Sequence, residues 1–194
     1  MNDKFNQNQL IHQIPAGLLS TDNSTELFGC RKTKKVYAIS KGKTIPFSEI
    51  NPVKRALIFE KLLNDDVAIA DLKDLPQNEA IEQYAFCMYG AVDHVPDFDC
   101  NGHLKPTENF ICSNNCRCLK WKSKWISING NRLTPRQLEI VTLFASDMPD
   151  KQIADRLHIT ESTLDTHKHH LFEKFGVNSK PGLITKAITN KIIQ

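Results

Sequence analysis

Four cysteines lie close together in the middle of the chain, at the spacing C-x11-C-x3-C-x-C: Cys100, Cys112, Cys116 and Cys118. Asn-Gly, Pro and Ser-Asn-Asn between them are residues of tight turns. Clustered thiolates brought together by turns are the usual ligands of tetrahedral zinc, which takes four in a structural site. The spacing is not a standard C-x2-C pair. We interpret the group as a structural zinc site, with an iron–sulfur cluster as an alternative that would also accept four thiolates.

Two further interpretations of the cysteine group remain open. The thiols could pack as small hydrophobic side chains, or a neighbouring pair could form a switchable disulfide. Four polar side chains lie near enough in sequence to replace a thiolate, although such residues are more often on the surface: His94, Asp97, Asp99 and His103. Cys30 and Cys87 have no near partner in sequence, and we expect structural roles for both.

Length and composition predict an ordinary globular protein with room for two small domains, or for one domain with a long arm. The chain has 194 residues, of which 40% are hydrophobic and 24% are charged. We find no apolar run of about eighteen residues that would span a membrane and no signal-peptide core at the N-terminus. We therefore expect a cytoplasmic protein without a membrane partner, in which cysteines stay reduced.

The stretch that begins at Leu133 predicts four short amphipathic helices. Thr134 and Gln137 form a capping box, and the proline between them suits the first helical position. A short second helix follows Pro149, Thr160 caps a third helix, and Gly176 ends it. Two helices joined by a turn of about four residues form a helix-turn-helix, whose second helix can enter the major groove of DNA.

The motifs in this stretch carry a family resemblance. They are Leu-Thr-Pro-Arg-Gln, Lys-Gln-Ile-Ala-Asp-Arg-Leu, Ile-Thr-Glu-Ser-Thr-Leu, His167 and Lys-Phe-Gly-Val at 174–177. Together they resemble the LuxR-type DNA-binding domain of bacterial transcription regulators, without gaps from Leu133 to about Ile192. The resemblance implies that the protein binds double-stranded DNA, and that it does so as a homodimer through the last helix, with RNA polymerase as a further candidate partner.

The resemblance also implies which residues contact DNA. The base-reading positions of the family correspond to Asp165, Thr166 and His169, and its phosphate-contacting positions to Lys151, Thr160 and Thr163. His170 and Lys174, on the same helix as the base readers, complete the candidate set. Leu164, His167, Leu171 and Phe175 recur at intervals of three and four, so we expect them to face inward.

The charge pattern of this region departs from what DNA binding favours. The family often has a basic residue at the position of Asp165, and a carboxylate near phosphates costs affinity, although it can accept from a cytosine amino group. A run between Arg117 and Arg136 contains six Lys or Arg and no Asp or Glu. That run could lie along phosphates, or it could be a solvated linker.

The N-terminal part predicts an α+β domain. Glu26 to Cys30 and Lys35 to Ile39 resemble strands, and helices are expected from Asn51 to Leu63 and from Gln77 to Tyr89, with the segment 67–75 ambiguous. The predicted organisation is a polar arm (1–14), an α+β input domain (15–99), a cysteine-rich region with a basic linker (100–132) and an all-α four-helix domain (133–194), with the helix-turn-helix at about 150–169. The N-terminal part lacks the acidic pair and phospho-accepting Asp of a receiver domain.

The sequence therefore favours a sequence-specific transcription regulator that is not an enzyme. No phosphate-binding glycine loop, nucleophile elbow or HExxH motif is present. One alternative is a regulator that senses metal or redox state through its cysteines. A second is a metal-dependent enzyme with a DNA-targeting tail, using His94, Asp97, Asp99 or His103 at an open metal site.

Overall fold

The computed structural model describes residues 14–113 and 116–193. The predicted polar arm therefore lies, except for its last residue, outside the described residues. The chain divides into two compact units. The N-terminal unit comprises Met1–Glu108 with Trp121–Ser123, and the C-terminal unit comprises Asn109–Lys120 with Lys124–Gln194.

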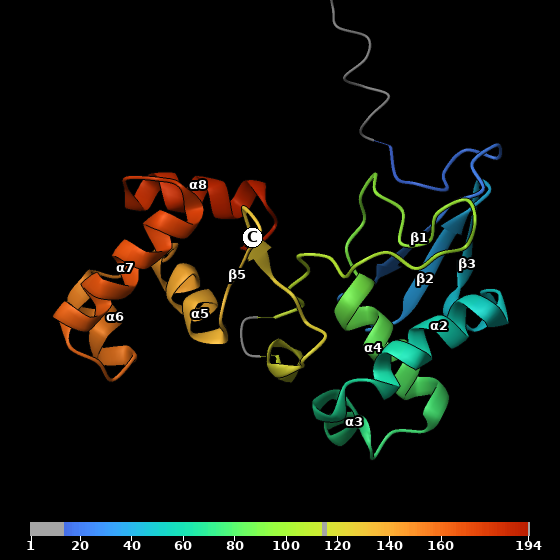
Figure 1. Cartoon of the computed structure of the whole chain (residues 1–194), viewed down its shortest axis with the longest axis horizontal. Helices are drawn as coiled ribbons and strands as arrows, with labels where there is room; N and C mark the ends of the chain where they lie inside the picture. Colours follow the sequence, from blue (N-terminus) through green and yellow to red (C-terminus); the bar gives the residue numbers. More distant parts are fainter. Residues whose placement is uncertain (1–13, 114–115, 194) are drawn as a thin grey trace, which may run out of the picture. The chain divides into compact units, whose positions relative to one another are not determined.

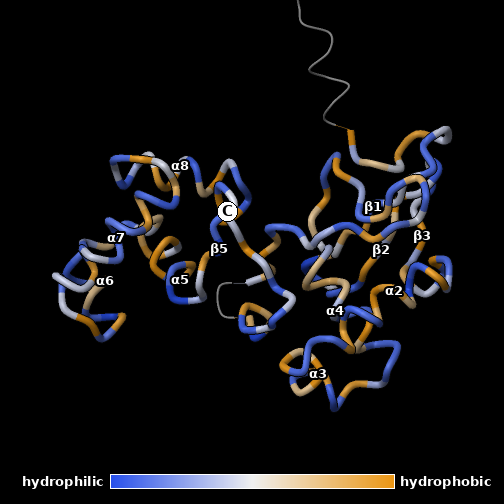
Figure 2. Tube along the Cα trace, in the orientation of Figure 1, coloured by the Kyte–Doolittle hydropathy of each residue, from blue (hydrophilic) through white to orange (hydrophobic). Residues whose placement is uncertain are grey.

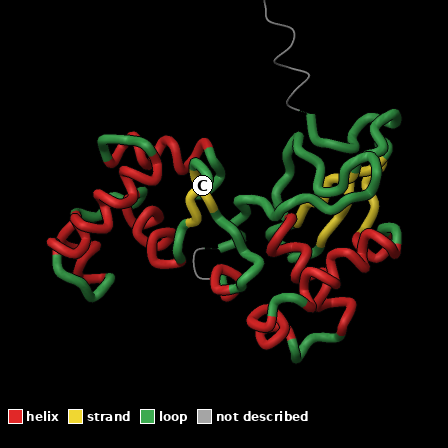
Figure 3. Tube along the Cα trace, in the orientation of Figure 1, coloured by secondary structure: helices red, strands yellow, loops and turns green. Residues whose placement is uncertain are grey.

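The N-terminal unit contains a three-stranded antiparallel sheet with the order β1-β2-β3. The strands are β1 (Thr25–Gly29), β2 (Val36–Ser40) and β3 (Lys43–Pro46), and the first two confirm the strands predicted from sequence. Lys41 and Gly42 connect β2 to β3 with φ of 51° and 74°. Positive φ at both central residues is the geometry of a type I′ hairpin turn, which matches the twist of the strands. Figure 3 shows these strands in yellow.

Three α-helices accompany the sheet, labelled in Figure 1. A short 3-10 helix, η1 (Phe47–Glu49), leads to α2 (Pro52–Leu63), α3 (Asp66–Leu72) and α4 (Gln77–Tyr89). The helices predicted at Asn51–Leu63 and Gln77–Tyr89 are confirmed, and the ambiguous segment is helical at α3. Helix α4 packs on β1, β2 and α2. A Cβ at Gly29 would lie 2.4 Å from the ring of Phe86, so only glycine allows β1 to approach α4 this closely.

The C-terminal unit begins with a cysteine-containing segment and a short hairpin. The segment ends in the 3-10 helix η2 (Arg117–Lys120), and the hairpin pairs β4 (Ser127–Ile128) with β5 (Asn131–Arg132). Asn129 and Gly130 form its turn with φ of 50° and 77°, again the type I′ geometry. Sequence reasoning treated these residues as linker. The structure corrects this, because the hairpin buries Ile128 in the core of the unit.

Four helices follow, as the sequence predicts: α5 (Pro135–Phe144), α6 (Asp150–Arg156), α7 (Glu161–Phe175) and α8 (Lys180–Thr189). The capping box of Thr134 and Gln137 is present. Gly176 adopts the left-handed conformation, and the amide of Val177 donates to the carbonyl of Phe172, which closes α7 as a Schellman motif. Helix α8 ends at Thr189, before the resemblance to the family ends at about Ile192.

The early end of α8 has a packing cause. Lys191 adopts a φ of 57°, and the amide of Ile192 donates back to the carbonyl of Ala187 at 2.8 Å. The chain thereby turns Ile192 and Ile193 onto the core. Hydrophobic and hydrophilic residues alternate along α5 to α8 (Figure 2), as amphipathic helices around one core require. No helix among the described residues has the length and apolar character that a bilayer crossing needs.

Candidate nucleic-acid interface

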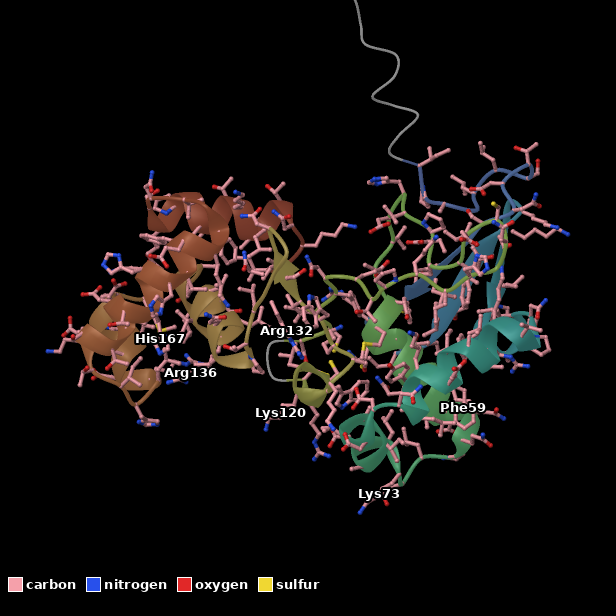
Figure 4. All side chains as sticks on the ribbon, viewed as in Figure 1. Phe59, Lys73, Lys120, Arg132, Arg136 and His167 are labelled. Carbon is pink, nitrogen blue, oxygen red and sulfur yellow. The ribbon has the colours of Figure 1, made fainter. Side chains whose placement is uncertain are left out.

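Helix α7 has one buried face and one exposed face. Leu164, Leu171 and Phe175 are buried and His167 is half-buried, which confirms the predicted inward face. Figure 4 labels His167 on α7 and Arg136 on α5. Of the eight predicted DNA-binding side chains, seven are exposed: Lys151, Thr160, Thr163, Asp165, Thr166, His169 and His170. A helix about 10–12 Å across that exposes one polar face fits the major groove, which is about 12 Å wide.

The N-terminus of α7 is held by two threonines. The amide of Thr163 donates to the hydroxyl of Thr160 at 3.1 Å, and the two hydroxyls are 2.8 Å apart. The Thr160 cap leaves the remaining amides of the first turn pointing out of the helix, where the positive end of the helix dipole favours an anion. The Thr166 hydroxyl donates to the carbonyl of Ser162 at 3.0 Å, so its lone pairs remain able to accept.

Lys168, which was not predicted as a site residue from the sequence, pairs with the acidic side chains near the exposed face of α7. Lys168 forms ion pairs with Asp165, one turn earlier on α7, and with Asp150 at 3.1 Å. Lys180 on α8 pairs with the other oxygen of Asp150 at 3.1 Å. Burial opposes ionisation of Asp150, but the hydrogen bonds from Lys180 and Lys168 outweigh it and lower the pKa of this carboxyl. The hydrogen bond that Lys168 donates to Asp165 raises the pKa of Lys168.

The ion pair changes the expectation for Asp165. The carboxylate does not stand alone beside the predicted phosphate contacts, because Lys168 neutralises it. The spacing of three residues on a helix is the signal that could have predicted this pair from sequence.

Lys174, a predicted DNA contact, and Arg136, a residue of the family motif, form hydrogen bonds within the C-terminal unit. The ammonium group of Lys174 donates to the carbonyl of Arg132 at 2.8 Å and to the side chain of Gln137 at 3.0 Å. Arg136 donates to the carbonyl of Leu157 at 2.6 Å, which satisfies an acceptor at the end of α6. Lys174, predicted as a DNA contact, is therefore engaged inside its own unit.

Most basic side chains between residues 117 and 136 also contact other groups of the protein. Lys122 donates to Asp66 at 2.8 Å, and Lys124 is buried with its ammonium group over the ring of Phe110. Arg132 lies over the ring of Trp125. Arg117 and Lys120 remain exposed on η2, with Lys120 labelled in Figure 4. The run is thus not an extended solvated linker.

The short helix α6, the turn and the longer helix α7 form a helix-turn-helix, with α6 packed on α7. The turn contains no glycine; His158 instead adopts the left-handed conformation with φ of 53°. Residues 131–187 match the family described as bacterial regulatory proteins, luxR family. These residues form a LuxR-family domain, which begins at the hairpin strand β5.

Relatives in the curated proteins match the same region. The oxygen regulatory protein NreC of Staphylococcus aureus strain JH9 is 37% identical over 62 residues, which is 32% of this chain and 29% of that relative. NreC of strains Mu3 and NCTC 8325 matches to the same extent. The chain thus spans less than a third of the length of these relatives. No solved structure matches the chain.

Three of the four predicted zinc ligands come together in the C-terminal unit. The sulfur atoms of Cys112, Cys116 and Cys118 all lie within 4.8 Å of one another. Cys100 belongs to the N-terminal unit, where it is exposed, and no group of potential metal ligands among the described residues contains it. Cys100 lies within a turn in which the amide of Gly102 donates to the carbonyl of Asp99.

The four side chains considered for an open metal site do not belong to any group of three or more potential metal ligands among the described residues. Asp97 is buried and accepts from the amide of Leu27 at 2.8 Å. Asp99 accepts from Lys105 at 2.9 Å and lies 3.3 Å from the His103 ring. These hydrogen bonds keep the pKa of Asp99 well below its ordinary value, with Lys105 as the largest cause. Asp97 and Asp99 therefore support the fold of the N-terminal unit.

A different set of carboxyl groups meets in the N-terminal unit. Oxygens of Glu26, Asp93 and Glu108 lie within 4.8 Å of one another, and Glu26 is fully buried. Burial raises the pKa of Glu26 to about 8, with nearby Glu108 and Asp93 adding to the rise. Burial likewise raises the pKa of Asp97. Sequence periodicity gave no signal for this group, because its members come from separate segments.

A groove also marks the N-terminal unit. It has a volume of about 310 Å³ and lies between α2 and α4, where Phe47, Ala56, Phe59 and Ile81 line it together with the polar side chains of Arg55 and Glu79. Phe59 is labelled in Figure 4. The buried Nε atom of Arg55 has no hydrogen-bond partner among the described residues. This groove is thus mainly apolar, with the guanidinium group of Arg55 and the carboxylates of Glu79 and Glu82 as its charged groups.

Proposed function

We propose that the protein binds double-stranded DNA at specific sequences through α7 and regulates transcription. The observation that carries the proposal is the exposed polar face of α7 within a domain that matches the luxR family. The name of the relative NreC, an oxygen regulatory protein, supports a regulatory role. In this proposal the N-terminal unit is the regulatory or interaction part, and RNA polymerase is the machinery on which the DNA-bound protein acts.

Phosphate contacts would position the helix and base contacts would give selectivity. Lys151 and the capped turn of Thr160 and Thr163 supply a cation and hydroxyl groups for phosphates. Thr166 and His169 are exposed on the next turns of α7, where they can reach base edges.

A homodimer would read two half-sites. On α8, Leu183 and Ala187 are buried in the core, whereas Ile188 is 54% exposed and Ile184 is half-buried. The exposed isoleucine extends the apolar stripe beyond what the domain itself needs, which suits a contact with a second copy. A two-fold dimer would bind an inverted repeat, and two linked contacts would raise affinity above that of one domain.

Selection of the full chain against random duplexes tests the proposal. We expect an enriched inverted repeat, bound with a strong dependence on salt. Lys151→Ala should weaken all duplexes alike and reduce the slope of log affinity against log salt by about 0.9. Thr166→Ala or His169→Ala should change the preferred bases. Lys73→Ala is a matched control, since it removes an exposed lysine of the N-terminal unit. Failure to enrich any sequence at low salt would overturn the proposal.

A further inference from the structure

Three thiols form a compact group in the C-terminal unit. The sulfur atoms of Cys112 and Cys118 are 4.0 Å apart, and that of Cys116 lies within 4.8 Å of both. A disulfide would bring two sulfurs to about 2.05 Å, so Cys112 and Cys118 are not bonded to each other. Cys118 is buried, and Cys112 and Cys116 are half-buried.

A backbone turn and the short 3-10 helix η2 bring these thiols together. The amide of Cys116 donates to the carbonyl of Ser113 at 3.3 Å, and the amide of Leu119 donates to the carbonyl of Cys116 at 3.1 Å. These two bonds wind the chain into η2, so that the side chains of Cys116 and Cys118 approach the same point. The geometry therefore depends on a few local hydrogen bonds.

The thiol segment is attached to the DNA-binding domain of the same unit. Ile111 and Leu119 pack against the hydrophobic core that α5 to α8 share. Asn109 exchanges two hydrogen bonds with the backbone of Ser127 in β4, each 2.9 Å long. The segment thus covers the hairpin side of the domain, although it contributes few buried apolar side chains of its own.

We propose that Cys112, Cys116 and Cys118 bind a zinc ion as thiolates and that the ion holds residues 109–113 and 116–120 on the DNA-binding domain. Zn–S bonds of about 2.3 Å in a tetrahedron separate two sulfurs by roughly 3.8 Å, close to the distance between Cys112 and Cys118. Each thiol releases its proton to solvent on binding, because the thiolate is the ligand. A fourth ligand completes the tetrahedron.

Zinc suits this segment for an energetic reason. A short loop-rich segment that buries few side chains gains little from the hydrophobic effect, and a metal site can supply the missing free energy. Loss of the ion should therefore loosen the segment and, through Asn109 and Ser127, the hairpin. The inference does not rest on DNA binding, since it concerns the stability of the unit.

Metal analysis of the full chain, purified without metal-affinity resin, tests the inference. We expect about one zinc ion per chain, and a loss of at least about tenfold in Cys112→Ser, Cys116→Ser and Cys118→Ser. Cys30→Ser is the matched control, because it removes a thiol of the N-terminal unit and should retain zinc. Zinc retained in all three variants, or iron with sulfide in the wild-type protein, would overturn the proposal.

The wild-type protein provides a second measurement in case the variants fail to fold. Cobalt substituted for zinc should give intense sulfur-to-metal absorption typical of thiolate ligation, and its absence would contradict the proposal. Cys87→Ser and Cys100→Ser then identify the fourth ligand. Loss of metal in one of them supports a closed site of four thiolates, and retention in both supports three thiolates with another donor. Hydrogen exchange should rise at residues 109–112 and 116–120 when a chelator removes zinc.

Discussion

Two carboxyl groups, Glu26 in the N-terminal unit and Asp150 in the C-terminal unit, behave in opposite ways. In the N-terminal unit Glu26 is fully buried, one of its oxygens has no hydrogen-bond partner among the described residues, and burial raises its pKa to about 8. In the C-terminal unit Asp150 is partly exposed and pairs with Lys168 and Lys180, which lower its pKa. The first unit thus places an acid where ionisation is costly, and the second places an acid where ionisation ties three helices together.

The two units also differ in the interactions that stabilise them. The C-terminal unit combines one apolar core with helix caps that are local in sequence. The N-terminal unit relies on long-range polar contacts, such as the bond from the Leu27 amide to Asp97, seventy residues apart. We therefore expect the stability of the two units to respond to different changes.

The largest expected effect is the loss of a core ring from the C-terminal unit. Phe175 is fully buried at the end of α7, and Phe175→Ala should cost about 3–5 kcal/mol, through lost transfer free energy and a cavity. Hydrogen exchange of the α7 amides would measure the change, with Phe175→Leu as a control that keeps an apolar side chain and much of its volume. A cost below about 1 kcal/mol would show that the apolar core does not dominate this unit.

The second prediction concerns pH and the N-terminal unit. Glu26 has an ordinary value of 4.5 and a folded pKa of about 8, so between these values the folded protein keeps a proton that the unfolded chain releases. Stability should therefore fall as pH rises through this window, by up to roughly 1.4 kcal/mol per pH unit. Exchange of the β1 and β2 amides, corrected for intrinsic rates, would show the fall, and Glu26→Gln should remove the part due to Glu26 while the part due to Asp97 remains.

Asp150 provides the comparison of opposite sign. Its pKa is lowered, so its contribution is present above the ordinary value of 3.8 and is lost as pH falls through the folded pKa. The side chain is 37% exposed, and solvent screening limits the effect to about 0–1 kcal/mol. Asp150→Asn should leave the dependence of stability on pH between 4.5 and 8 as it is in the wild-type protein. If the substitution changed that dependence as much as Glu26→Gln does, the lowered pKa of Asp150 would be contradicted.

The third prediction addresses the local caps. Thr160→Ala removes the acceptor for the Thr163 amide and should destabilise α7 by about 1 kcal/mol, whereas Thr160→Ser should retain most of the stability. Thermal unfolding of the three proteins would measure the difference. Equal stability of the alanine and serine variants would indicate that core packing alone fixes the start of α7.

The same contrast explains what the sequence could predict. Thr134, Thr160 and Gly176 act within a few residues of their own positions, so the helix starts and ends of the C-terminal unit were predictable. Glu26 and Asp97 meet through folding of distant segments, which no local period records. The thiol group was partly predictable, because three of its members are close in sequence while Cys100 is separated by eleven residues.

Two features were visible in the sequence and overlooked. Asn129-Gly130 is the strongest dipeptide signal for a two-residue hairpin, but the segment was predicted as a linker because of its basic residues. Lys168 lies three residues after Asp165, the spacing of a helical ion pair, but the resemblance directed the choice of residues to positions that contact DNA. In both cases a local rule would have corrected a prediction based on charge alone.

The smallest expected effect on stability tests this ion pair. Asp165→Asn removes the pair with Lys168 and should cost about 0.2–0.5 kcal/mol, since the pair lies on the helix surface. The variant also removes a negative charge beside the proposed phosphate contacts and leaves Lys168 paired with Asp150 alone, so affinity for arbitrary duplexes should rise. If Asp165 accepts from a cytosine, discrimination at that base should fall by about 1–3 kcal/mol.

Asp155→Asn, which removes an exposed acid on α6, is the charge-matched control. Equal gains in both variants would mean that Asp165 acts only as bulk charge, whereas lost discrimination confined to Asp165→Asn would identify it as a base reader.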